Sequence, residues 1–357
     1  MERQIVDLTS RLVAIPTHET ASDAQALLAE RMTALGFDCN LHEIFPGHAN
    51  LVAVRGTGGP LLCSHVDVHP PHAHHDPWTA THIAGTLVGR GVVDAKGQIA
   101  ALVAAAAAVP DAPAIVLITS DEETTGFGSQ RATLPAGLDR SAGGVVLEPT
   151  SFVACTAQAG CIELALRVSA QPSHAYATDR ATSAIDVLQG AIDALRECAF
   201  LRRRHPRLPA PDLLTSTLGA GEHPWRTPAH ATATVALGLV PGLDPSTALE
   251  EATETLDALA TVWRTEGITL AYDVLDSSDA IEISEDLPVV HRLLRSGAIA
   301  VGGMSSWTDA SNLLLHPGLP CVVFGAGELT TAHSDRESVA VSDLVRLGGV
   351  LARFLAG

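Results

Sequence analysis

The feature that most constrains the fold is a series of short apolar runs, each followed closely by a histidine or by acidic residues. Three such runs lie at 61–63, 115–118 and 144–147. Runs of this length, bounded by turns, are typical of strands buried on both faces. They alternate with helical stretches such as the alanine-rich segment 95–109, which Pro110 ends. The alternation predicts an α/β fold in which helices flank a mostly parallel sheet.

The first part of the chain gives further local predictions. Residues 4–35 are predicted to form an amphipathic helix or a broken pair of helices, interrupted near Pro16 and ending at Gly36. Residues 50–55 alternate as in a strand. The glycine-rich turn 56–60 lacks the Lys-Ser/Thr ending of a phosphate-binding loop. We therefore expect it to join that strand to the next as a hairpin.

The pattern changes beyond Thr150, where alternating strands and two helices follow one another. Strands are predicted at 162–168, 231–240 and 268–274, and helices at 184–199 and 246–264. We interpret 156–274 as an inserted α+β domain. Residues 1–155 and 275–357 then form one discontinuous α/β domain. Its pattern resumes with 288–298 and continues with a strand at 321–324 and a closing helix from Ser342.

Charge and composition exclude several classes of function. The chain has 22 basic and 40 acidic residues, a net charge of −18, and only one lysine, Lys96. This balance argues against nucleic-acid and anionic-membrane partners. The acidic start does not resemble a secretory signal, and the longest apolar stretch, 99–109, is shorter than the roughly 20 residues of a membrane span. We expect a soluble, cytoplasmic protein with its six cysteines reduced.

The polar residues that follow the predicted strands have the chemistry of metal ligands. They are His65 and Asp67, Asp94, the acidic cluster 121–123, Glu148 and His333. Taken singly, Asp94 is equally well explained as a helix N-cap. The alternative for the acidic cluster is a solvated loop, which its place directly after a buried strand disfavours. Together they supply two histidines and several carboxylates at one edge of a sheet. That donor set suits a dinuclear zinc centre, or cobalt or manganese in the same geometry.

These motifs resemble, in the same order, those of a known family. They read Ser-His65-Val-Asp67, Gly-Arg-Gly-Val-Val-Asp94-Ala-Lys-Gly, Asp-Glu122-Glu123, Glu148-Pro-Thr and His333-Ser-Asp-Arg-Glu337. The family comprises dinuclear zinc amidohydrolases and peptidases, including acetylornithine deacetylase, succinyl-diaminopimelate desuccinylase, aminoacylase and glutamate carboxypeptidase. The resemblance extends over both parts of the predicted α/β domain, which would be zinc-exopeptidase-like.

The resemblance implies a role for each matching residue. His65 and Glu148 would bind one divalent metal, Glu123 and His333 the second, and Asp94 both. Asp67 would orient His65, because a metal-bound imidazole is held through its second ring nitrogen. Glu122 would be the general base that takes a proton from a water bridging the two metals and passes it to the leaving amine.

The insertion resembles the family's lid and dimerisation domain. His174 in Ser-Ala-Gln-Pro-Ser-His-Ala is similar to the histidine that stabilises the oxyanion, often across a homodimer. The alternative is a surface loop histidine. Three positions that are usually polar in the family are Ala159, Ala236 and Gly238 here.

Four further residues are candidates for substrate binding. Arg180 and Arg226 are candidate replacements for the polar positions that the insertion lacks. Thr308 and Asp309 resemble a loop near the substrate, or else cap the following helix. The histidines at 69, 72, 74 and 75 look like a metal site, but two prolines interrupt them, and we interpret them as a loop at the mouth of the site.

The expected function is metal-dependent hydrolysis of the amide bond of a small N-acyl amino acid, as by acetylornithine deacetylase. A dipeptidase or carboxypeptidase of the same family is an alternative. A non-catalytic binding protein stabilised by metals is a third.

Overall fold

The computed structural model describes residues 1–357, which divide into two compact units. The larger unit comprises Met1–Thr156, Ile283–Met304 and Thr308–Gly357. The smaller unit comprises Ala157–Glu282 and Ser305–Trp307. The smaller unit thus includes most of the predicted insertion and continues beyond 274 to Glu282. It also includes three residues from a later part of the chain, Ser305–Trp307.

The main sheet has nine strands, and its centre is parallel. Their order is β1-β2-β6-β3-β7-β15-β8-β13, with β14 paired to β8. The pairs β6–β3, β3–β7 and β7–β15 are parallel, whereas β1–β2, β2–β6, β15–β8 and β8–β13 are antiparallel. The strands are β1 (Asp38–Phe45), β2 (His48–Arg55), β3 (Leu61–His65), β6 (Ala114–Thr119), β7 (Gly144–Val146), β8 (Val153–Gln158), β13 (Ile281–Glu282), β14 (Ala300–Met304) and β15 (Cys321–Val323). The predicted α/β class with a mostly parallel central sheet is confirmed.

The predicted hairpin at 56–60 is wrong. β2 and β3 are not neighbours, because β6 lies between them, antiparallel to β2 and parallel to β3. Gly59 lies against the backbone of Pro113 and Ala114, where a Cβ atom would come within 2.4 Å of Ala114 N. The turn therefore connects two strands across an inserted third one.

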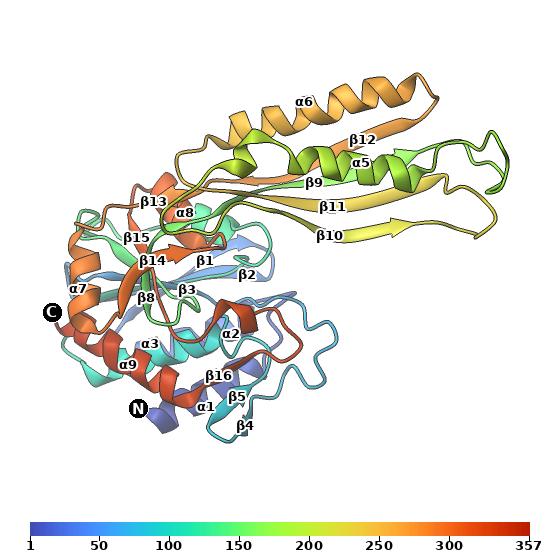
Figure 1. The fold of residues 1–357 in the computed structure, drawn as a ribbon. Helices are drawn as coiled ribbons and strands as arrows, with labels where there is room; N and C mark the ends of the chain where they lie inside the picture. Colours follow the sequence, from blue (N-terminus) through green and yellow to red (C-terminus); the bar gives the residue numbers. More distant parts are fainter. The chain divides into compact units, whose positions relative to one another are not determined.

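Helices of the larger unit cover the sheet and pack on one another. Figure 1 shows α1, α2, α3 and α9 together on one face of the sheet, and α3 contacts both α1 and α9. The helices are α1 (Glu2–Val13), α2 (Ser22–Ala34), α3 (Lys96–Ala108), α4 (Phe127–Gln130), α7 (Pro288–Ser296), α8 (Asp309–Leu315) and α9 (Val341–Ala356). The predicted break near Pro16 separates α1 from α2. Three short strands, β4 (Thr81–Ile83), β5 (Thr86–Val88) and β16 (Ser338–Ala340), form a separate sheet.

Burial explains why the apolar runs of the sequence form these elements. Every residue of β3 and β6 is buried, as expected for strands covered on both faces. α3 is buried around nearly its whole circumference, and its alanines allow close approach to α1 and α9 at no cost in side-chain entropy. One continuous apolar core results in this unit.

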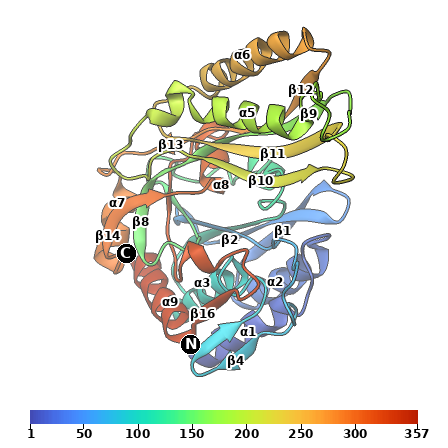
Figure 2. The same cartoon turned by 45° about the vertical axis from the view of Figure 1, so that its right-hand side comes forward.

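The smaller unit is an α+β layer with its own core. Its antiparallel sheet has the order β10-β11-β9-β12, and helices α5 and α6 pack on it. Figures 1 and 2 both show the two helices along one face of this sheet. Burial alternates along β9 and β11, so one side chain in two enters the core. The elements are β9 (Gly160–Ser169), α5 (Ala184–Arg196), a 3₁₀ helix (Ala199–Arg202), β10 (Leu213–Ala220), β11 (His230–Leu239), α6 (Pro245–Arg264) and β12 (Thr269–Ser278).

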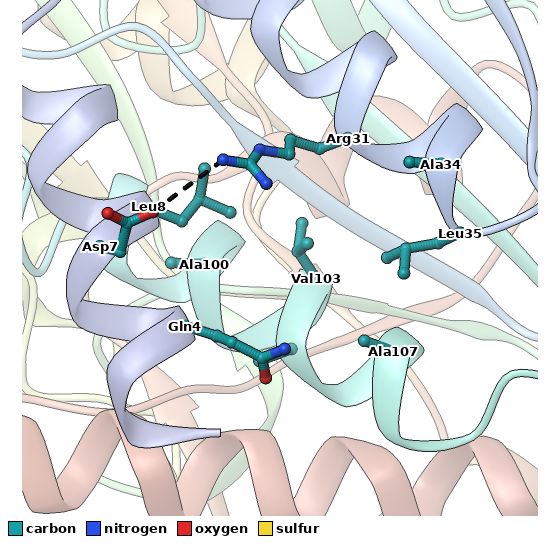
Figure 3. Close-up of a pocket in the computed structure, with 10 residues that line it drawn as sticks. Gln4, Asp7, Leu8, Arg31, Ala34, Leu35, Ala100, Val103 and Ala107 are labelled. Atoms are coloured by element: carbon teal, nitrogen blue, oxygen red, sulfur yellow. Dashed lines mark ion pairs between the residues drawn. The ribbon is translucent and has the colours of Figure 1, made fainter.

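A cavity of about 160 Å³ lies among α1, α2 and α3 (Figure 3). Asp7 and Arg31 face each other across it at 3.9 Å, and the rest of its lining is mostly apolar side chains of the three helices. None of the predicted site residues lines this cavity. None of the helices combines the length and apolar character that crossing a bilayer requires.

Candidate metal centre

Three candidate ligands follow strands in the parallel centre of the main sheet. His65 is the last residue of β3, Glu123 follows β6, and Glu148 follows β7. His65 pairs in register with Thr119, the last residue of β6. Because parallel strands end at the same edge of a sheet, these side chains are brought close together.

The other two candidate ligands come from loops. Asp94 lies two residues before α3, and His333 lies just beyond a 3₁₀ helix at Leu329–Thr331. His333 has a φ of 57°, a left-handed conformation that costs a non-glycine residue about 1–2 kcal/mol. Such strain is concentrated at functional sites, where the surroundings hold it in place.

The side chains of all five candidate ligands meet around Asp94. His65 Nε2 is 3.0 Å from Asp94 Oδ1 and 3.5 Å from Glu148 Oε1. His333 Nε2 is 3.3 Å from Asp94 Oδ2 and 2.9 Å from Glu123 Oε2. Each oxygen of Asp94 therefore faces one histidine, and each histidine also faces a glutamate.

The donor set fits divalent cations. Glu123 Oε1 and Glu148 Oε1 are buried and form no hydrogen bond. A buried charge without a hydrogen-bond partner costs several kcal/mol, a cost that a bound cation would offset. Ligand atoms of His65, Asp94 and Glu123 all lie within 4.8 Å of one another. Imidazole nitrogen and carboxylate oxygen are ligands that zinc binds well.

The electrostatics of the cluster also favour positive charge. Burial, with Asp94 and Glu123 among its neighbours, raises the pKa of Glu148 well above its usual range. Burial lowers the pKa of His333, but hydrogen bonds to Asp94 and Glu123 outweigh it and raise that pKa to about 10. For Asp94, burial raises the pKa but the two histidines hold it below its usual value. Glu148 thus favours protonation and His333 favours the charged form unless another cation is present.

Adjacent glutamates have different surroundings. The Glu123 carboxylate faces His333, and its backbone N–H donates to Asp67 Oδ2 at 3.0 Å. Glu122 is partly exposed, and its carboxylate forms no hydrogen bond or ion pair within the protein. Burial together with Glu148 and Glu123 raises its pKa well above the usual range.

The contact between His65 and Asp67 is made mainly by the backbone. His65 Nδ1 donates to the Asp67 carbonyl at 3.1 Å, whereas the carboxylate lies 3.7 Å away. This hydrogen bond leaves Nε2 directed at Asp94 and Glu148. The Asp67 side chain instead holds the loop of Glu123.

Two structural alternatives raised by the sequence are wrong. Asp94 does not cap α3, because Ala95 occupies the N-cap position and no side chain caps that helix. The acidic cluster is not a solvated loop. Asp121 is buried and accepts hydrogen bonds from Thr124 and Thr125, and the Glu123 side chain is only 5% exposed.

His174, Arg180 and Arg226 belong to the smaller unit. His174 and Arg226 face each other in an isolated antiparallel bridge, and Arg226 forms an exposed ion pair with Glu222 at 3.0 Å. Their contact with substrate stays a prediction.

Thr308 and Asp309 are buried in the larger unit. Thr308 caps α8 by accepting from Ala310 N at 3.2 Å, so the capping alternative is confirmed for this residue. Asp309 accepts from Thr119 Oγ1 at 2.6 Å at the end of β6. A substrate contact of either residue stays a prediction.

The histidine loop lies beside the centre without joining the ligand cluster. The ring of His69 stacks on His333, with 4.4 Å between ring centroids, and His72 lies 4.9 Å from His69. Neither belongs to the group of residues whose ligand atoms converge.

One contact beside the centre was not predicted. Arg90 and Glu337 form a buried ion pair, although the sequence analysis gave neither a role. The available signal was their place inside two of the quoted motifs.

Comparison with known proteins places this geometry in a family. Residues 61–357 match the model of peptidase family M20/M25/M40. A probable succinyl-diaminopimelate desuccinylase of Staphylococcus epidermidis is 25% identical over 95% of this chain and 93% of the relative. An acetylornithine deacetylase of Myxococcus xanthus is 29% identical over 98% of this chain and 94% of the relative.

Solved structures share the fold. A tripeptidase from Staphylococcus aureus has a TM-score of 0.80 at 18% identity, covering 99% of this chain and 98% of that one. Human carnosine dipeptidase 1 has a TM-score of 0.78 at 15% identity, covering 99% and 96%. The family model matches most of the chain, and the sequence motifs that suggested the family come together in one site. The chain therefore belongs to peptidase family M20/M25/M40 and is an enzyme of this hydrolase family.

Proposed function

We propose that this enzyme hydrolyses the amide bond of an N-acyl amino acid at a dinuclear metal centre. The observation that carries the proposal is the Asp94 carboxylate, which lies between two histidines that each face a glutamate. The relatives named deacetylase and desuccinylase, whose names describe removal of an acyl group, support this choice of substrate.

The five ligand candidates divide between two cations. His65 and Glu148 would hold one, Glu123 and His333 the other, and Asp94 would contact both. Zinc suits this donor set, and cobalt or manganese are alternatives. When bound, the cations polarise the scissile carbonyl and favour ionisation of water.

Glu122 supplies the proton transfers. Its carboxylate takes a proton from the attacking water while the water oxygen bonds to the carbonyl carbon. It then donates that proton to the amide nitrogen as the C–N bond breaks. The second proton of the water passes from the new carboxylic acid to the amine, so that a carboxylate and an ammonium group leave. Its lack of a hydrogen-bond partner within the protein leaves it available for this role.

The smaller unit would complete the site. His174 would stabilise the oxyanion, from the same chain or across a homodimer, and Arg180 and Arg226 would bind the substrate carboxylate. Ala159, Ala236 and Gly238 line one cavity of about 460 Å³ in this unit. No arginine or lysine lines it, so a substrate carboxylate has no cationic partner there.

The substitution Glu122→Gln tests the role of the general base. It keeps the size of the side chain and removes its basicity, so we expect turnover to fall by about 10²- to 10⁴-fold. Metal content, measured by mass spectrometry of the purified protein, should not change, because Glu122 is not a proposed ligand. Glu30→Gln on the exposed face of α2 is the control, and an unchanged kcat for Glu122→Gln would contradict the assignment.

The same residues would serve a dipeptidase or carboxypeptidase. Structures with this fold include a tripeptidase and a dipeptidase, which keeps this alternative open. Parallel assays of the zinc- or cobalt-loaded enzyme on N-acetyl amino acids and on dipeptides separate the two. Hydrolysis of neither class with both metals bound would favour a non-catalytic binding protein.

A further inference from the structure

Glu337 is a fully buried carboxylate whose two oxygens both bind one loop. Oε1 accepts from the backbone N–H groups of Val93 at 3.0 Å and Asp94 at 3.2 Å. Oε2 accepts from Gly91 N at 2.9 Å and from Arg90 Nη1 at 2.8 Å. Four donors from residues 90–94 therefore converge on a single side chain.

This side chain joins two segments that carry metal-ligand candidates. Glu337 and Asp94 are 243 positions apart in the sequence. Glu337 lies four residues after His333, and its backbone carbonyl also accepts from Gly89 N at 3.2 Å. Hydrogen bonds to Glu337 thus connect the loop of Asp94 to the loop of His333, close to the point where the Asp94 and His333 side chains meet.

Stability alone does not explain a buried ion pair at this place. The Arg90 and Glu337 side chains are 1% and 0% exposed, and removing two charges from water costs about as much as their attraction returns. Apolar side chains of similar volume would fill the space at least as favourably. What only a carboxylate provides is an acceptor for several backbone N–H groups at once, which fixes the course of the backbone through Asp94.

We propose that Glu337 is a positioning residue that holds the Asp94 carboxylate between the two metal ions. This positioning role rests on the proposed function, because it presupposes the dinuclear centre. Glu337 accepts hydrogen bonds from the backbone N–H groups of Val93 and Asp94, which fixes the position of the Asp94 Cα atom. With that point fixed, Asp94 Oδ1 faces His65 and Oδ2 faces His333.

The substitution Glu337→Gln tests this role. A glutamine places an amide N–H₂ against either Arg90 and Gly91 or Val93 and Asp94, so two donors lose their acceptor. We expect affinity for divalent metal to fall by about 10- to 100-fold, as for other residues that orient metal ligands. Titration calorimetry with Zn²⁺ alone measures the affinity, and the visible absorption of the Co²⁺-loaded protein reports the ligand geometry.

Kinetics separate positioning from a purely structural role. At saturating metal we expect kcat to fall with little change in KM, because Glu337 does not contact substrate. Asp335→Asn is the matched control, since Asp335 is an exposed acid two residues away. Should Glu337→Gln not fold, Glu337→Asp keeps the charge and shortens the side chain, and the same measurements should show a smaller loss.

The outcomes distinguish this inference from the proposed function. A folded Glu337 variant with wild-type metal affinity, cobalt spectrum and kcat overturns the positioning role alone. A variant that loses thermal stability but keeps all three when loaded with metal also overturns it. If the wild-type chain binds no divalent cation, both proposals fail.

Discussion

Burial changes the chemistry of side chains well beyond the candidate metal centre, as the cysteines show. All six thiols are free, four of them are buried, and none pairs with another. Burial raises the pKa of Cys155 to about 12 and, with Glu163 and Asp276 nearby, that of Cys161 to about 11. A raised pKa keeps a thiol protonated and therefore unreactive at neutral pH.

Cys161 should react slowly with alkylating reagents. With a pKa near 11 its thiolate fraction at pH 8 is about 10⁻³, against about 0.2 for an ordinary cysteine. We expect iodoacetamide to modify it at least about 100-fold more slowly than glutathione at pH 8, with a rate that rises about tenfold per pH unit until pH approaches 11. Peptide mapping after timed labelling measures this, with Cys161→Ser identifying the peptide. Labelling of the native protein at the glutathione rate would contradict it.

At the scale of elements, the start of α3 is packed too closely for any side chain at Gly97. A Cβ atom there would lie 2.1 Å from the Val92 carbonyl oxygen and 3.2 Å from both methyl carbons of Leu344 on α9. Gly97 N and Lys96 N also donate to the carbonyl of Gly91. The glycine therefore lets the loop of Asp94 fold back on the helix that follows it.

Gly97→Ala should destabilise the larger unit. The added methyl group meets a backbone oxygen that cannot rotate away, so we expect a loss of about 1–3 kcal/mol in the free energy of unfolding. Urea denaturation measures the difference. Gly137→Ala is the control, because an added Cβ there has no atom within 4 Å, and it should change stability by less than about 0.5 kcal/mol. Equal effects of the two substitutions would show that the contact is not close in solution.

Most elements that depend on local pattern were predictable, and those that depend on distant pairing were not. The helices at 2–13 and 22–34, the alanine-rich helix and the fully buried strands all follow from periodicity and from breakers such as Pro16. β10 was missed because it is an exposed edge strand without apolar alternation. The hairpin at 56–60 was wrongly predicted for another reason, since only the long-range insertion of β6 separates β2 from β3.

In the candidate site, too, residues marked by a local pattern were predictable, and contacts between distant segments were not. His65, Glu123 and Glu148 could be found because each comes after a recognisable strand. Glu337 could not be given a role, because its four hydrogen bonds arise only when two distant loops meet. Likewise, only the structure shows that the Asp67 backbone rather than its carboxylate holds His65.

At the scale of the whole molecule, the smaller unit has an unpaired sheet edge. β10 pairs only with β11, and its side chains Leu214 and Leu218 are 64% and 67% exposed. Long edge strands with exposed apolar side chains are prone to pair with another chain. This edge supports the proposed homodimer, in which two copies associate through their smaller units.

Leu218→Lys should separate the proposed dimer. A charge on the exposed edge opposes burial against a second copy, so light scattering should give the mass of one chain where the wild type gives twice that mass. Val274→Lys on β12, the other edge strand and also exposed, is the control and should leave the dimer intact. A wild-type mass of one chain would contradict the dimer.

The single lysine gives the surface an unusual chemistry. Lys96 is fully buried, and its Nζ donates to the carbonyl of Ile15 at 2.8 Å. The other 21 of the 22 lysine and arginine residues are arginines. Guanidinium groups neither lose their charge below about pH 12 nor attack acyl donors as amines do. The folded surface therefore offers no lysine amine to acetylation, glycation or aldehyde cross-linking, and its positive charges persist wherever such modification neutralises those of other proteins.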